Sequence, residues 1–272
     1  MYVSMLLSRW YTLSESIHEA VTVEKSEFYR FLSMTSCMQP GYATVDIDEV
    51  FPPNDAVSTV RRDVTGTLGC THTRVAILNG TEDTIRTPAA ADEHLVLPID
   101  AHLRIDTSGT IPDPGLGFIP AGAASEIHFD VPGTAIIISA NVPDPNGSST
   151  VLDLDTRSYE IPETSDVAIA WLTDQLGCRE MKVNARRLES GQHVPLHTEG
   201  TQEELFVPLT GTGSMRLDAT RRETPVGTIT RVSPETPRSA HNDGSTSALW
   251  VMIGAPPTGD SDWWDPGAEI LE

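Results

Sequence analysis

Short apolar runs separated by turn-forming residues make up most of the chain from Tyr42 onward. Segments such as 74–78 and 135–139 are rich in Ile, Val, Leu and Ala, and Gly, Pro, Asp and Asn stand between them. A second series of the same kind includes 182–188 and 248–253. Neither series contains a helical spacing long enough for a helix of ordinary length. The pattern therefore predicts an all-β fold, a sandwich or a barrel.

The two series look like copies of one unit. Leu-Gly-Cys at 68–70 recurs at 176–178. The segment HLVLPIDAHLRID, which begins at His94, runs parallel to ELFVPLTGTGSMRLD, which begins at Glu204, and each has a proline at its fifth position. Because proline inside a strand is tolerated only at an edge or a bulge, its recurrence indicates a shared irregularity. We therefore expect two β-barrels in tandem.

The distribution of turn residues divides the chain into five parts. Prolines and an Asn-Gly pair are dense between the two copies, which marks a linker there. The first residues show apolar positions at helical spacing, which predicts one or two short helices or, alternatively, a poorly ordered extension. The expected parts are an N-terminal extension (1–41), a first barrel (42–140), a linker (141–166), a second barrel (167–256) and a C-terminal tail (257–272).

The net charge of the chain disfavours some classes of binding partner. With 39 acidic and 18 basic residues, the net charge is −21, which disfavours binding to nucleic acid or to an anionic membrane surface. Of the basic residues only Lys25 and Lys182 are lysines. An acidic, lysine-poor surface is typical of the high-salt cytoplasm of a halophilic archaeon, because dense carboxylates keep the surface hydrated. An ordinary acidic protein is the alternative.

Cysteine use and hydropathy indicate a cytoplasmic location. The three cysteines, Cys37, Cys70 and Cys178, form no CxxC pair, so neither a zinc knuckle nor a disulfide framework is predicted. No stretch approaches the roughly 20 apolar residues that span a bilayer. The apolar run near the N-terminus is too short for the core of a signal peptide.

The segment GQHVPLHTEGTQEELFVPLTG, at 191–211, carries the clearest candidate chemistry. His197 and Glu199 are two residues apart, so in a strand their side chains share a face. Glu204 meets them from the next strand if a short loop joins the two. One imidazole and two carboxylates are suitable ligands for a divalent transition metal.

This spacing, Gly-x5-His-x-Glu-x4-Glu-x6-Gly, resembles the first sequence motif of the cupins, with Glu199 where the family usually has a second His. The second cupin motif can be laid on Gly227 through Asn242, where Arg238 replaces the last metal-binding His. The resemblance implies two cupin-like barrels (double-stranded β-helix or jelly roll) and the ligand set His197, Glu199 and Glu204, one short of the usual four.

Three interpretations of this site remain open. In the first, Fe, Mn, Ni or Zn binds His197, Glu199 and Glu204 with water at the open positions. In the second, Arg238 is the local cation and pairs with a carboxylate or with an anionic substrate, since an arginine keeps its proton and does not coordinate a metal. In the third, the carboxylates belong to the solvated surface. His193 lies four residues before His197 and is a candidate for the same pocket face, with a position at the rim of the barrel as the alternative.

The first copy has no comparable ligand set. Its positions aligned with the ligands of the second copy are Thr87, Ala89, His94 and Ser125. We therefore expect the first barrel to be structural.

Two functions are compatible with these residues. The first is a metal-dependent small-molecule enzyme of the dioxygenase or isomerase type, in which Arg238 and His193 contact an anionic substrate; the sequence assigns no catalytic residue. The second is a non-catalytic bicupin that binds a small ligand or serves as a structural subunit. A homodimer is the expected assembly in either case.

Overall fold

The computed structural model describes residues 41–51, 59–81, 84–87, 91–106, 108–143, 147–163 and 165–258, and the backbone of 261–263. Apart from Gly41, the expected N-terminal extension lies outside the described residues, as does Ala89. No helix in the described ranges is long and apolar enough to cross a membrane.

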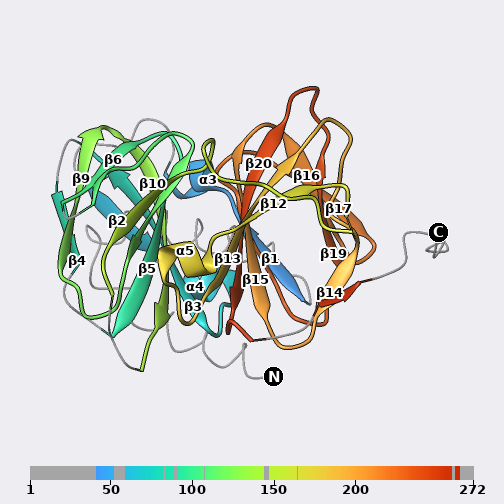
Figure 1. Cartoon of the computed structure of the whole chain (residues 1–272), viewed down its shortest axis with the longest axis horizontal. Coiled ribbons are helices and arrows are strands. Elements are labelled where there is room, and N and C mark those ends of the chain that lie inside the picture. Colours follow the sequence, from blue (N-terminus) through green and yellow to red (C-terminus); the bar gives the residue numbers. More distant parts are fainter. Residues whose placement is uncertain are drawn as a thin grey trace, which may run out of the picture. The chain divides into compact units, whose positions relative to one another are not determined.

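The first copy forms two antiparallel sheets, which confirms the predicted all-β fold (Figure 1). One sheet has the strand order β11-β8-β5-β10-β3-β2 and the other the order β4-β9-β6-β7. The elements are β2 (Val60–Asp63), α4 (Thr65–Leu68), β3 (Thr73–Gly80), β4 (Thr84–Thr87), β5 (Asp92–Pro98), β6 (His102–Ile105), β7 (Gly109–Thr110), β8 (Gly115–Ile119), β9 (Ser125–Val131), β10 (Gly133–Asn141) and β11 (Thr150–Asp153).

The second copy repeats this arrangement. Its sheets have the strand orders β1-β18-β15-β20-β13-β12 and β17-β16-β19-β14-β21. The elements are β12 (Ala168–Trp171), α5 (Thr173–Leu176), β13 (Lys182–Leu188), β14 (His197–Glu199), β15 (Glu203–Thr210), β16 (Gly213–Leu217), β17 (Thr220–Thr224), β18 (Ile229–Val232), β19 (Arg238–Asn242), β20 (Ala248–Ala255) and β21 (Ser261–Trp263).

The repeated Leu-Gly-Cys motif ends a one-turn helix in each copy. Gly69 follows α4 with φ 67° and Gly177 follows α5 with φ 78°, a left-handed conformation that glycine adopts without steric cost. Leu68 and Leu176 are buried beside these turns. The motif therefore marks the corner at which the chain turns into the first long strand of each barrel.

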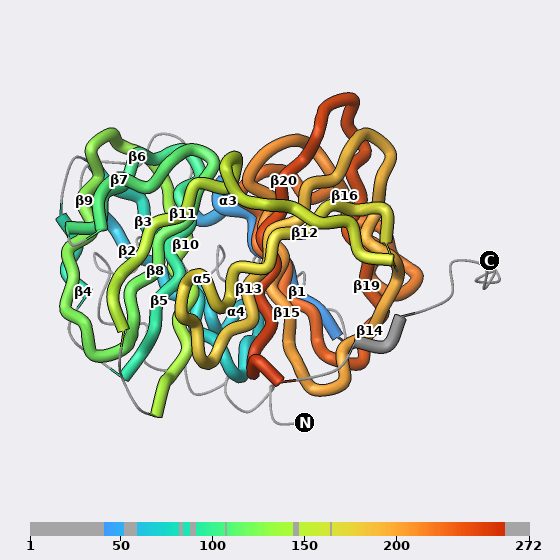
Figure 2. Tube along the Cα trace, viewed as in Figure 1, coloured from blue at the N-terminus to red at the C-terminus, as the bar shows by residue number. Residues whose placement is uncertain are grey.

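Two strands belong to a different part of the structure from the one expected from the sequence. β1 (Tyr42–Val45), the first described strand, pairs with β18 of the second barrel rather than joining the first. β11, which lies within the expected linker, pairs with β8 of the first barrel. Figure 2 shows the blue segment β1 among the orange strands. Each added strand covers what would otherwise be an open sheet edge, which satisfies its backbone N–H and C=O groups.

The C-terminal tail also contributes a strand. The backbone of β21 pairs with β14, so that His197 lies opposite Trp263 and Glu199 opposite Ser261. β14 would otherwise be the edge of its sheet. A short helix, α3 (Ile47–Val50), follows β1.

Glu203 of the second barrel is bound by backbone of the first. Its carboxylate accepts the N–H groups of Thr71, His72 and Thr73, each at 2.9 Å, and the hydroxyls of both threonines. Arg231 pairs with the same carboxylate at 3.1 Å. Burial favours the neutral acid, but these backbone hydrogen bonds outweigh it and lower the pKa of Glu203.

Glu93 makes the reciprocal contact at the matching position of the first barrel. Its carboxylate accepts the N–H groups of Arg179 at 2.9 Å and Glu180 at 3.0 Å, just after α5 of the second barrel. Here burial outweighs the hydrogen bonds and raises the pKa of Glu93. We call the two contacts, made by Glu203 and Glu93, the carboxylate clamps. In each clamp a glutamate of one barrel binds the loop that follows the Leu-Gly-Cys turn of the other barrel.

The clamps are expected to contribute unequally to stability. Glu203→Gln removes a charge that three N–H groups and Arg231 stabilise, so it should lower the free energy of unfolding by about 3 kcal/mol. Glu93→Gln should lower the free energy of unfolding by only about 1–2 kcal/mol, because the charge that it removes is already destabilised by burial. Urea unfolding at pH 7, followed by circular dichroism, measures both. Equal costs, or the reverse order, would contradict this account.

Candidate metal centre

The second barrel brings the predicted ligands together. His197 and Glu199 come from β14, where alternation places them on one face, and Glu204 comes from β15. All three are buried, with exposures of 2%, 5% and 7%. The interpretation in which these carboxylates belong to the solvated surface is therefore wrong.

The three side chains converge on one point. Each offers a ligand atom, and these atoms lie within 4.8 Å of one another. His197 Nε2 is 3.4 Å from Glu204 Oε2 and 3.8 Å from Glu199 Oε1. His197 Nδ1 lies 2.9 Å from the Pro195 carbonyl, which can only accept, so Nδ1 donates and Nε2 faces the carboxylates.

These separations fit an ion held between the side chains. Two atoms that bind one tetrahedral ion at about 2.1 Å lie about 3.4 Å apart. A direct hydrogen bond would bring the nitrogen and oxygen to about 2.7–3.2 Å. One nitrogen and two carboxylate oxygens form a donor set suited to Mn, Fe or Zn. The residues present therefore fit a divalent transition metal.

Arg238 holds Glu204 instead of facing the cavity. Its Nε donates to Glu204 Oε2 at 2.9 Å, and its Nη1 donates to the carbonyls of Pro234 and Thr236. Its side chain is fully buried, and Nη2 has no hydrogen-bond partner in the described part of the chain. Although burial favours the neutral acid, His197 and the charge of Arg238 hold the pKa of Glu204 at about 2. Glu204 is therefore a carboxylate with a fixed orientation.

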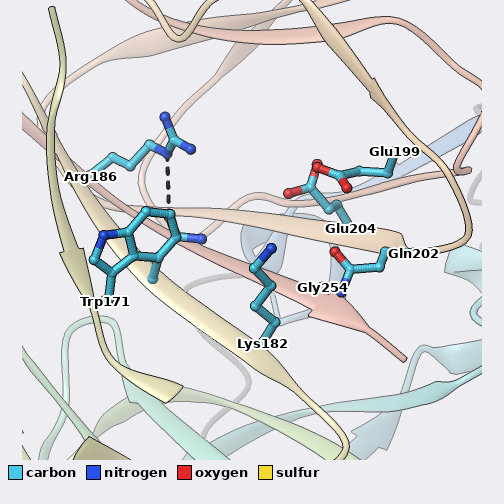
Figure 3. A pocket seen from close by; sticks show the side chains of 8 residues that line it. Trp171, Lys182, Arg186, Glu199, Gln202, Glu204 and Gly254 are labelled. Atoms are coloured by element: carbon cyan, nitrogen blue, oxygen red, sulfur yellow. Dashed lines mark hydrogen bonds between the residues drawn. The ribbon is translucent and has the colours of Figure 1, made fainter. Parts of the chain in front are cut away.

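A small cavity of about 40 Å³ adjoins the two glutamates. Besides Glu199 and Glu204, its walls are formed by Trp171, Lys182, Asn184, Arg186, Gln202 and Gly254. Figure 3 shows the two carboxylates on one side, Arg186 on the other and the amino end of Lys182 between them; the dashed line is the bond from Arg186 to Asn184.

Sequence reasoning missed the residues of β13. Lys182, Asn184 and Arg186 alternate along it and so share one face. Burial lowers the pKa of Arg186, and the charges of Glu204 and Glu199 oppose that change. The polar residues at every second position, one of them a scarce lysine, were the signal that could have indicated an inward polar face.

His193 lies elsewhere than expected. Its backbone bridges to His241, and the two rings stack with centroids 5.1 Å apart. It does not line the cavity beside Glu204. The strand is interrupted between His193 and His197, at 194–196, so alternation does not carry from one histidine to the other. His193 therefore packs against another histidine and does not reach a ligand in the cavity.

In the first barrel each described side chain at an aligned position forms a hydrogen bond with a nearby residue. His94 lies 2.8 Å from the hydroxyl of Ser139. Ser125 donates to Asp106, and Thr87 donates to the carbonyl of Ser125. In the described residues, His197, Glu199 and Glu204 are the one group of three or more side chains that could hold a metal ion.

Solved structures resemble the chain over most of its length. A putative glyoxylate-induced protein from Pseudomonas aeruginosa superposes with a TM-score of 0.67 at 14% identity, covering 81% of this chain and 90% of that one. The oxalate decarboxylase of Lactobacillus farciminis, in complex with formate, gives 0.61 at 10% identity, covering 85% and 90%. Bacillus subtilis oxalate decarboxylase, which has Mn(II) centres, gives 0.62 at 10% identity, covering 84% and 81%.

These structures are cupin-fold proteins, so the chain has the cupin fold expected from its motifs. At such low identities the likeness extends to the fold alone. No protein-family model matches the chain, and no curated protein matches its sequence.

The stacked histidines generate a prediction about pH. Burial, then the charge of Arg221 and then that of His193 lower the pKa of His241 to about 4. Because the unfolded chain takes up this proton near pH 6.5, the fold should lose stability as the pH falls from about 6.5 to about 4. Titration by NMR of the imidazole C–H protons should place His241 near 4. His193→Gln should raise that value, whereas a value near 6.5 in the wild-type protein would contradict this account.

Proposed function

We propose that the second barrel binds one divalent transition metal ion on His197, Glu199 and Glu204 and uses it to act on a small molecule. The observation that carries this proposal is the convergence of three buried ligand atoms within 4.8 Å. Manganese, iron and zinc suit the donor set best. The Mn(II) centres of the Bacillus subtilis oxalate decarboxylase support manganese as the first ion to test.

The residues around the ligands would prepare them for the metal. The Pro195 carbonyl holds the His197 ring so that Nε2 points inward, and Arg238 keeps Glu204 ionised. A bound metal would supply a Lewis acid and lower the pKa of a coordinated water. With three protein ligands, positions on the ion remain for water or substrate. We therefore favour an enzyme over a purely structural site, with dioxygenase and isomerase chemistry as the first reactions to test.

A second candidate is a non-catalytic bicupin. Arg238 stands where cupins usually have their last metal-binding His, and it already pairs with Glu204 at 2.9 Å. Together with a protonated His197 it would balance the charges of Glu199 and Glu204 without any ion. In that case the cluster would be a buried network of ion pairs that stabilises the barrel.

Metal content separates the two candidates. Full-length protein purified in concentrated KCl without chelators should contain about one Mn, Fe, Ni or Zn per chain by elemental analysis. His197→Ala should lose at least about ten times in metal affinity, since a ligand is removed. His193→Ala is the matched control, because that histidine stacks on His241 instead of facing the ligands.

Removal of the metal gives a second readout. Dialysis of the wild-type protein against a chelator should lower its melting temperature, and Mn(II) should restore it, because an ion that binds only the folded state stabilises that state. Wild-type protein without metal, even after incubation with each ion, would favour the non-catalytic candidate. An equal loss of metal in His193→Ala would also contradict the proposed ligand set.

A further inference from the structure

Three neighbouring strands form part of the cavity wall. Lys182 on β13 lies opposite Gly254 on β20, and Gly254 lies opposite Glu204 on β15. The amide of Gln202 lies over Gly254, because a Cβ there would be 2.9 Å from Gln202 Oε1. An alanine at 254 would therefore displace this amide, which also lines the cavity.

The wall opposite the glutamates is cationic. Lys182 is one of two lysines in a chain of net charge −21, and it lines the cavity. Arg186 lies four residues further on the same face of β13, and its Nε donates to Asn184 at 3.3 Å. Two cations on one cavity wall therefore give this wall a positive potential, in contrast to the acidic chain as a whole.

The charge count of the cavity favours an anionic ligand once a metal is bound. The charged residues that line it are two glutamates, Glu199 and Glu204, and two cations, Lys182 and Arg186. A divalent metal on the ligands would leave an excess of positive charge. Buried charges of one sign are costly unless they are paired, and burial already disfavours the charged form of Arg186.

We propose that Lys182 and Arg186 bind the carboxylate of a small organic acid, whose other end faces His197, Glu199 and Glu204. The inference rests on the proposed metal function, because the bound ion supplies the excess of positive charge. About 10–15 Å³ holds one water molecule. The cavity of about 40 Å³ therefore has room for only a few non-hydrogen atoms, as in an acid of two or three carbons.

Trp171 forms part of the cavity wall and is 46% exposed. Its indole N–H donates to Glu160 at 2.6 Å, which fixes the ring. A fixed aromatic ring in the wall limits the size of the acid that fits.

Calorimetric titration of the full-length protein with acetate, glyoxylate and acetamide tests the proposal, with and without Mn(II). Acetamide has nearly the shape of acetate but no charge. The two carboxylates should bind at least about ten times more tightly than acetamide, since charge-assisted hydrogen bonds are stronger than neutral ones. Lys182→Gln and Arg186→Gln should each weaken carboxylate binding about tenfold or more. Gly254→Ala should weaken it by displacing the amide of Gln202.

Arg187→Gln is the matched control. Arg187 neighbours Arg186 on β13 but points the other way, where it pairs with Asp155 at 2.8 Å. Its removal should leave acetate binding unchanged, whereas an equal loss in this variant would overturn the proposal.

The outcomes also distinguish this inference from the metal function. If no metal binds but acetate still binds and depends on Lys182 and Arg186, the contact with the two cations stands and the metal function fails. If acetate binding needs Mn(II) and is the same in Lys182→Gln and Arg186→Gln, the metal function stands and the inference is overturned. Equal binding of acetate and acetamide, or no acetate binding in either condition, would also overturn the inference.

Discussion

A carboxylate from each barrel accepts backbone N–H groups of the other, and this exchange of hydrogen bonds organises the rest of the structure. Glu203 and Glu204 are neighbours on β15, so their side chains point to opposite faces of the strand. Glu203 binds the loop of the first barrel, and Glu204 enters the cavity of the second. The strand that carries a candidate metal ligand is thus anchored to the other barrel one residue away. The first barrel thus helps to hold the strand that carries this candidate ligand, in line with the structural role expected of it.

Local patterns in the sequence were enough for the strands and the repeat. Alternation and the resemblance to the first cupin motif predicted that His197, Glu199 and Glu204 would lie close together, and the structure brings them together. The partners of β1 and β11 could not be predicted, because strand pairing over long distances leaves no local signal. The position of Lys182 and Arg186 in the cavity wall was missed because a polar residue in a strand is normally expected to face solvent.

Arg238 changes the chemistry expected from the cupin motifs. A histidine there would bind the metal directly, whereas the guanidinium binds Glu204 and two carbonyl groups. At this position Arg238 thus orients a candidate ligand and does not itself coordinate an ion. One imidazole and two carboxylates remain as candidate ligands, and they would bring more negative charge to an ion than the usual histidine-rich set. Such a set would stabilise higher positive charge on a bound metal.

The pairing partners of β1 and β11 determine the order in which the two barrels can finish folding. β1 pairs with β18, and Tyr42 lies about 190 residues from its partner Val232. During synthesis at 5–20 residues per second, β1 would wait roughly 10–40 seconds for that partner to leave the ribosome. The first barrel can close earlier, because β11 follows it directly in the chain. The barrel with the candidate site is thus the last to be completed, because β1 waits for β18 and because β20 and β21 are made later still.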